Sequence, residues 1–146
     1  MQTISSFYTL AKEFLKFLDE NEISNNSLMY LITTLMKLYI AGTNLPNIEP
    51  DDIECHYTNK KPLIRIHKDI QTYYFEFFNP FIDEEPVCSD LNDDIMCIYD
   101  DLQCGIEEYE SGKIGNAVCE WRVGLQNHWG QHAVDAIRAL HTLYNY

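Results

Sequence analysis

The sequence predicts an all-α protein, a compact bundle of about five helices, on the basis of three observations. Apolar residues recur at helical spacings over most of the chain. The most extended of these patterns cover residues 89–110 and 116–144, which we expect to form two long helices. The connection between them, Ser111–Gly115, is short, and a short connection favours antiparallel packing of the helices that it joins.

Two shorter helices are expected earlier in the chain. Residues 5–20 place apolar side chains at helical spacing, and Ser5 or the serine after it can cap the first turn. Residues 27–41 repeat the pattern, with Ser27 as the cap and Gly42 as the residue that ends the helix. These two helices would supply a large part of the core.

The middle of the chain leaves alternatives open. Prolines exclude a continuous helix over residues 43–62, so we expect a loop or irregular segment there, with a short strand over residues 55–58 as an alternative. Apolar spacing over residues 66–77 favours a third helix, but the β-branched and aromatic run at residues 72–78 makes a strand the competing prediction. Ser89 would cap the helix that follows.

Length and charge restrict the class of protein. A chain of 146 residues fits one domain, residues 1–146. Its net charge is −13, and such a surface repels phosphate backbones and anionic membranes. We therefore expect no nucleic-acid or membrane partner, and a basic protein or a cation as the electrostatic complement.

The lack of a recognisable targeting signal and the pattern of cysteines predict a cytoplasmic protein. Charged residues interrupt the N-terminal apolar segment at Lys12, Glu13 and Lys16, so no signal peptide is expected. No apolar stretch approaches the roughly 20 residues of a membrane span. The five cysteines are an odd number without CxxC spacing, which is typical of reduced thiols.

Acidic residues are concentrated in one segment. Between Lys68 and Lys113 the chain has no Lys or Arg but thirteen acidic residues. On the helix of residues 89–110 they form three pairs spaced by seven: Asp93-Asp94, Asp100-Asp101 and Glu107-Glu108. Seven residues is nearly two turns, so the first members form a row that faces solvent and the second members form a row that flanks the apolar stripe. The flanking row is positioned to meet a cation.

Three polar side chains interrupt the apolar stripe of the last helix. His128, His132 and Asp135 fall on one face, and two histidines four apart with a carboxylate three residues on can share a metal ion. Asp94 and Asp101 on the neighbouring helix would complete the ligand set. The spacing has low specificity, because the Glu of the HExxH motif is absent.

A polar network without metal is the alternative interpretation. Buried imidazoles usually donate from one ring nitrogen and accept at the other. In this interpretation Arg122 or Arg138 would neutralise Asp135, Asp94 or Asp101 as an ion pair.

The C-terminal half also resembles a known family. The segment Glu120–Arg122, the stretch HWGQHAVDAIRALH at residues 128–141 and the segment Leu91–Ile95 are similar to signatures of the bacterial family DUF5063, a domain of unknown function. The resemblance covers roughly residues 70–143. It implies a small bacterial protein and no particular activity. The family usually has Asp where this chain has Cys97, which implies one carboxylate fewer in the site.

Three functional hypotheses follow. The first is a small acidic protein of uncharacterised role that acts as a non-enzymatic binding or interaction module. The alternative is a metal-dependent hydrolase that uses His128, His132 and Asp135, with a divalent metal as its cofactor. A small-ligand pocket beside Trp121 and Trp129 is a third option. No catalytic residue can be assigned from the sequence.

Overall fold

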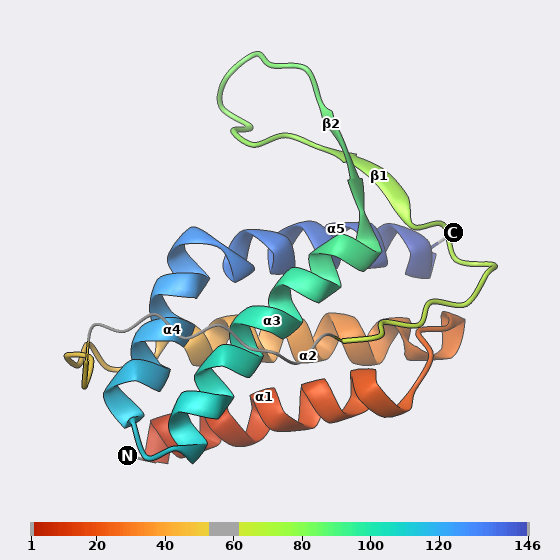
Figure 1. Ribbon diagram of the computed structural model, residues 1–146. Helices are drawn as coiled ribbons and strands as arrows, with labels where there is room; N and C mark the ends of the chain where they lie inside the picture. Colours follow the sequence, from red (N-terminus) through yellow and green to blue (C-terminus); the bar gives the residue numbers. More distant parts are fainter. Residues whose placement is uncertain (1, 53–61, 146) are drawn as a thin grey trace.

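The computed structural model describes residues 2–52 and 62–145. In these residues it has five α-helices, one short 3-10 helix and a two-stranded antiparallel sheet (Figure 1). In chain order the elements are α1 (Gln2–Glu20), η1 (Asn25–Ser27), α2 (Leu28–Thr43), β1 (Tyr73–Glu76), β2 (Val87–Asp90), α3 (Leu91–Glu110), α4 (Ile114–Asn127) and α5 (Trp129–Asn145). The predicted helical bundle is therefore confirmed, and the β1–β2 hairpin is an addition to it.

The core lies between two central helices and their neighbours. Helices α2 and α3 each pack against α1, α4 and α5. At the centre the ring of Phe7 lies 4.8 Å from that of Trp121 and 6.3 Å from that of Trp129, measured between centroids. Both indoles are fully buried and donate to backbone carbonyls, those of Leu102 and Trp121 respectively. The two tryptophans thus serve as core residues with satisfied N–H groups.

The N-terminal helices form where their apolar periodicity predicts, but α1 begins earlier and α2 ends later than expected. Helix α1 begins three residues early, so Ser5 lies inside it and its hydroxyl donates to the carbonyl of Gln2. Gly42 does not end α2, which continues to Thr43. A Cβ at Gly42 would lie 3.0 Å from Leu125, so the glycine allows α2 to pack closely on the C-terminal helices. None of these helices, and no other in the described residues, is long and apolar enough to cross a bilayer.

The prediction of one long final helix over residues 116–144 is wrong. The helix is interrupted at His128, whose backbone angles are φ −146° and ψ −84°. The segment therefore forms two helices, α4 and α5. A Cβ at Gly130 would overlap the carbonyl of Leu125 and lie 2.9 Å from its carbon, so only glycine permits this tight turn. The indole of Trp129 fixes the turn by donating to the carbonyl of Trp121 at 2.8 Å.

The predicted third helix over residues 66–77 is also wrong, and the competing strand is correct in part. Residues Tyr73–Glu76 form β1 and pair with β2 in the register Tyr73↔Asp90 to Glu76↔Val87. Ser89 belongs to β2 and does not cap the next helix. Asp90 does so instead, because its carboxylate accepts from the backbone N–H of Asn92 at 3.0 Å.

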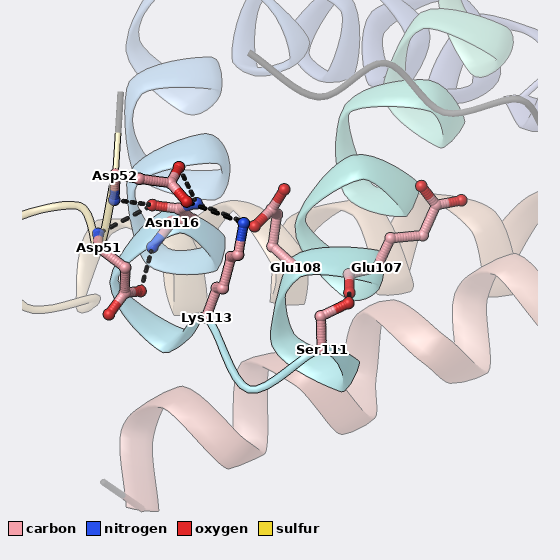
Figure 2. A network of polar contacts seen from close by, with 7 residues as sticks. All are labelled: Asp51, Asp52, Glu107, Glu108, Ser111, Lys113 and Asn116. Atoms are coloured by element: carbon pink, nitrogen blue, oxygen red, sulfur yellow. Dashed lines mark hydrogen bonds and ion pairs between the residues drawn. The ribbon is translucent and has the colours of Figure 1, made fainter. Parts of the chain in front are cut away.

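The segment after α2 has no helix or strand over residues 44–52, as expected. Hydrogen bonds connect it to the first turn of α4 (Figure 2). The side-chain oxygen of Asn116 accepts from the backbone N–H groups of Asp51 and Asp52, at 2.8 and 3.2 Å. Its amide nitrogen donates to Asp52 and Glu108, at 2.9 Å each. Lys113 adds an ion pair to Asp52 at 2.8 Å. The alternative strand over residues 55–58 lies outside the described residues.

Asn116→Asp is expected to destabilise the protein by about 2 kcal/mol. The change replaces two N–H donors with a carboxylate that faces the acceptors of Asp52 and Glu108. Urea unfolding at neutral pH measures the loss. Asn127→Asp, an exposed position on the same helix, is the matched control and should change stability by less than about 0.5 kcal/mol. Equal losses in the two variants would contradict the role assigned to this network.

Candidate metal site between α3 and α5

The flanking row of acidic residues on α3 lies along the seam between this helix and the α4–α5 pair. Each member meets a polar side chain from the C-terminal helices. Asp94 contacts His132, Asp101 contacts His128 and Glu108 contacts Asn116. Asp94 and Glu108 are buried. The spacing of seven residues thus places three carboxylates at three successive levels of one interface.

The most buried of these contacts joins His132 to Asp94. The distance from Nδ1 of His132 to the Asp94 carboxylate is 2.7 Å, and the Asp94 side chain is 2% exposed. This hydrogen bond, together with one to Cys97, raises the pKa of His132 to about 10. Burial raises the pKa of Asp94, against the opposing attraction of His132. At neutral pH the pair is an imidazolium and a carboxylate.

The second contact joins His128 to Asp101, also at 2.7 Å from Nδ1. His128 is the residue at the break between α4 and α5, and its side chain is 51% exposed. Its ring meets that of His132 edge to face, with 4.8 Å between centroids. Two imidazoles, each held by a carboxylate from α3, therefore lie side by side at the edge of the seam.

Cys97 completes this group. One ligand atom each from Cys97, His128 and His132 all lie within 4.8 Å of one another. Because Nδ1 of each ring faces a carboxylate, Nε2 is the nitrogen that remains for a further ligand. From the sequence, Cys97 was expected to leave the site with one carboxylate fewer. Its position three residues after Asp94, on the same flank of α3, is the signal that could have identified it.

Asp135 lies in a neighbouring group and not with the two imidazoles. Its carboxylate accepts from Gln131, and it lies with Glu76 of β1 and Asp94, one oxygen of each being within 4.8 Å of the others. Asp94 connects the two groups, because it contacts His132 and also lies with Glu76 and Asp135.

Arg122 and Arg138, the arginines expected to pair with these carboxylates, lie elsewhere. Arg122 donates to Asn47 at 2.8 Å. Arg138 lines a pocket of about 360 Å³ between β1 and α5, with Tyr73, Phe75 and Leu143 among its neighbours. Within the described residues, the imidazoles of His132 and His128, and not the two arginines, contact Asp94 and Asp101.

The titration of Glu76 is expected to make the stability of the protein depend on pH. Burial, and then a hydrogen bond to Asp135, raise its pKa to about 7. The unfolded carboxyl titrates near 4.5, so its contribution to stability is complete below that pH and is lost as pH rises through about 7. Glu76→Gln should therefore stabilise the protein at pH 8 by on the order of 1–2 kcal/mol, and by less at pH 5.5.

Urea unfolding of both proteins at the two pH values tests this prediction. Glu85→Gln, which changes an exposed glutamate of the hairpin, is the matched control and should show no such difference. A stabilisation by Glu76→Gln that is the same at pH 5.5 and pH 8 would contradict the assignment.

The fold and the site together define a helical protein with a histidine–carboxylate seam. The chain belongs to the family described as Domain of unknown function (DUF5063), whose model matches residues 1–145. The resemblance noted in the C-terminal half therefore extends to the N-terminal helices.

Among solved structures, the chain is similar to protein BF1032 from Bacteroides fragilis, with 19% identity and a TM-score of 0.73. The alignment covers 100% of this chain and 97% of that chain. At this level of identity the similarity shows a shared fold. The comparison with curated proteins finds no match.

Proposed function

We propose that the protein is a binding module in which Cys97, His128 and His132 hold one transition-metal ion, of which Zn²⁺ fits the donor set best. The observation that carries this proposal is the grouping of one sulfur and two imidazoles within 4.8 Å. Thiolate sulfur and imidazole nitrogen are the ligands that Zn²⁺ prefers, at roughly 2.3 and 2.0–2.1 Å.

The carboxylates behind the imidazoles support the same proposal. Histidines that bind metals usually donate their second ring N–H to a carboxylate, which fixes the ring and makes it a stronger ligand. Both His128 and His132 have such a carboxylate at 2.7 Å, supplied by Asp101 and Asp94. Binding at Nε2 of His132 displaces a proton, so the affinity for metal should rise with pH.

A titration with Zn²⁺ against a chromophoric chelator tests the proposal. The wild-type protein should bind one equivalent, and Cys97→Ala should weaken binding at least 100-fold. Cys97→Asp replaces the thiolate with another anionic ligand and should keep measurable affinity. Cys88→Ala removes an exposed thiol of β2, which is not one of the three ligands, and should bind as the wild type does. Equal affinity in the Cys97→Ala and wild-type proteins would overturn the proposal.

A hydrolase is the second candidate, favoured by one observation. A pocket of about 290 Å³ opens beside the site and is lined by Asp101 and His128, with Glu120 and Asn127. Three protein ligands leave one tetrahedral position for water, and the pocket could admit a substrate to it. Hydrolysis of activated ester or phosphoester substrates by the zinc-loaded protein, lost in His128→Ala, is the expected result. No turnover above that of free Zn²⁺ would leave binding as the sole role.

A cytoplasmic location belongs to the same proposal. Four cysteines in the described part of the chain are free thiols: Cys88, Cys97, Cys104 and Cys119. A reducing compartment keeps thiols in this form, and a thiolate ligand requires it.

A further inference from the structure

We propose that the β1–β2 hairpin is the docking surface for a partner protein that presents an apolar patch bordered by Lys or Arg. The hairpin projects beyond the helices, and its connecting loop lies away from them (Figure 1). This inference is independent of the metal site, because none of the three metal ligands belongs to the hairpin.

The hairpin exposes an unusual amount of apolar surface. Seven of its large apolar side chains are between 40% and 94% exposed: Tyr73, Phe75, Phe77, Phe78, Phe81, Ile82 and Val87. Single exposed apolar residues are ordinary, but a large exposed apolar patch marks an interaction site. Tyr73 and Phe75 share one face of β1, because residues two apart in a strand point the same way.

Local hydrogen bonds link residues of the hairpin tip. The side-chain oxygen of Asn79 accepts from the backbone N–H of Phe81 at 3.0 Å. The backbone N–H of Asn79 donates to the carboxylate of Glu84 at 2.7 Å. A surface that is already ordered loses less conformational entropy when it binds. A partner that contacts the exposed Phe78 and Phe81 would therefore lose less affinity to the ordering of the tip.

Charge identifies the kind of partner. Asp83 and Glu85 are exposed at the tip, and no Lys or Arg occurs between Lys68 and Lys113. A second copy of the chain would bring the same acidic hairpin and a net charge of −13, so like charges would oppose its docking. An anionic lipid surface is repelled in the same way. A partner that pairs an apolar patch with basic residues satisfies both features of the hairpin.

The test uses two synthetic amphipathic peptides with identical apolar residues, one carrying Lys and the other Glu at its polar positions. Fluorescence anisotropy measures their binding to the full chain. The Lys peptide should bind at least ten times more tightly than the Glu peptide, and more weakly as salt rises. The double variant Phe78→Ser/Phe81→Ser should lose at least ten-fold in affinity for it.

The matched control changes two exposed apolar residues of α2, Met36→Ser/Ile40→Ser, and should bind the Lys peptide as the wild type does. Equal loss in the two double variants, or no binding of the Lys peptide, would overturn the proposal. A wild-type dimer in sedimentation that Phe78→Ser/Phe81→Ser dissociates would assign the hairpin to self-association instead. Hairpin-dependent binding to neutral phosphatidylcholine vesicles would assign it to lipid.

Discussion

Gly105→Ala is expected to destabilise the protein by about 4 kcal/mol, above the usual range for an overpacked core. A Cβ at this position would overlap the indole nitrogen of Trp121 and lie 2.5 Å from two of its ring carbons. The ring cannot move aside, because it is fully buried, donates to the carbonyl of Leu102 and packs on Phe7. The gain in helix propensity on replacing Gly by Ala, about 1 kcal/mol, offsets only part of the strain.

A double-mutant cycle isolates this contact. Gly105→Ala should cost less in a Trp121→Ala background than in the wild type, since alanine has none of the ring atoms that the new Cβ meets. Urea unfolding of the four proteins gives the coupling energy. If the substitution costs the same free energy in both backgrounds, the close approach of α3 and α4 at Gly105 is not what limits this position.

His132→Ala is expected to have two large effects. Affinity for Zn²⁺ should fall at least 100-fold, because one of three ligands is removed. The free energy of unfolding should fall by about 3 kcal/mol, because the buried carboxylate of Asp94 loses its 2.7 Å contact and, among the described residues, keeps the Ser89 hydroxyl, 3.5 Å away, as a hydrogen-bond donor. His141→Ala changes an exposed histidine of the same helix and should leave both quantities near their wild-type values.

The pH dependence of this effect has a definite sign. The pKa of His132 is raised to about 10 from an ordinary value of 6.5. The stability that the pair contributes is therefore complete below about pH 6.5 and is lost as pH rises toward 10. The destabilisation by His132→Ala, measured by urea unfolding without metal, should shrink between pH 7 and pH 10. A difference that grows with pH would contradict the imidazolium–carboxylate assignment.

Adding Asp94→Ala to His132→Ala provides a further check. The second change removes the unpaired carboxylate, so the double variant should be more stable than His132→Ala alone. Additive losses would mean that Asp94 is stabilised by something other than His132.

Local periodicity was enough to predict much of the helical fold. The apolar stripes of α1, α2 and α3 each bury one face, so each stripe reports its own helix. The break at His128 is different, because it depends on Gly130 closing against the carbonyl of Leu125 and on the indole bond of Trp129. Nothing in the periodicity of residues 116–144 distinguishes a continuous helix from two.

Strand β1 shows the same limit. Residues 66–77 have apolar positions that fit a helix, but Tyr73–Glu76 become a strand because Val87–Asp90 pair with them. That pairing joins segments separated by a ten-residue loop. The spacing of apolar residues within one segment therefore carries no information about it.

For the site, the helical wheel placed His128 and His132 beside the flanking row of α3, and the structure places them there. The wheel also grouped Asp135 with them, on the assumption of one straight helix. In the structure Asp135 faces Glu76 and Asp94. Tertiary packing decides that histidines and not Arg122 contact Asp94 and Asp101. Arg122 instead donates to Asn47, which is distant in sequence.

The most direct test of the metal site is the location of bound zinc in a crystal. A crystal grown with one equivalent of Zn²⁺ should show a single strong anomalous peak at the zinc absorption edge. The peak should lie about 2.0–2.1 Å from Nε2 of His128 and His132 and about 2.3 Å from the sulfur of Cys97. No peak at this position, with the two imidazoles still held by Asp101 and Asp94, would show that the seam is a structural ion-pair network and not a metal site.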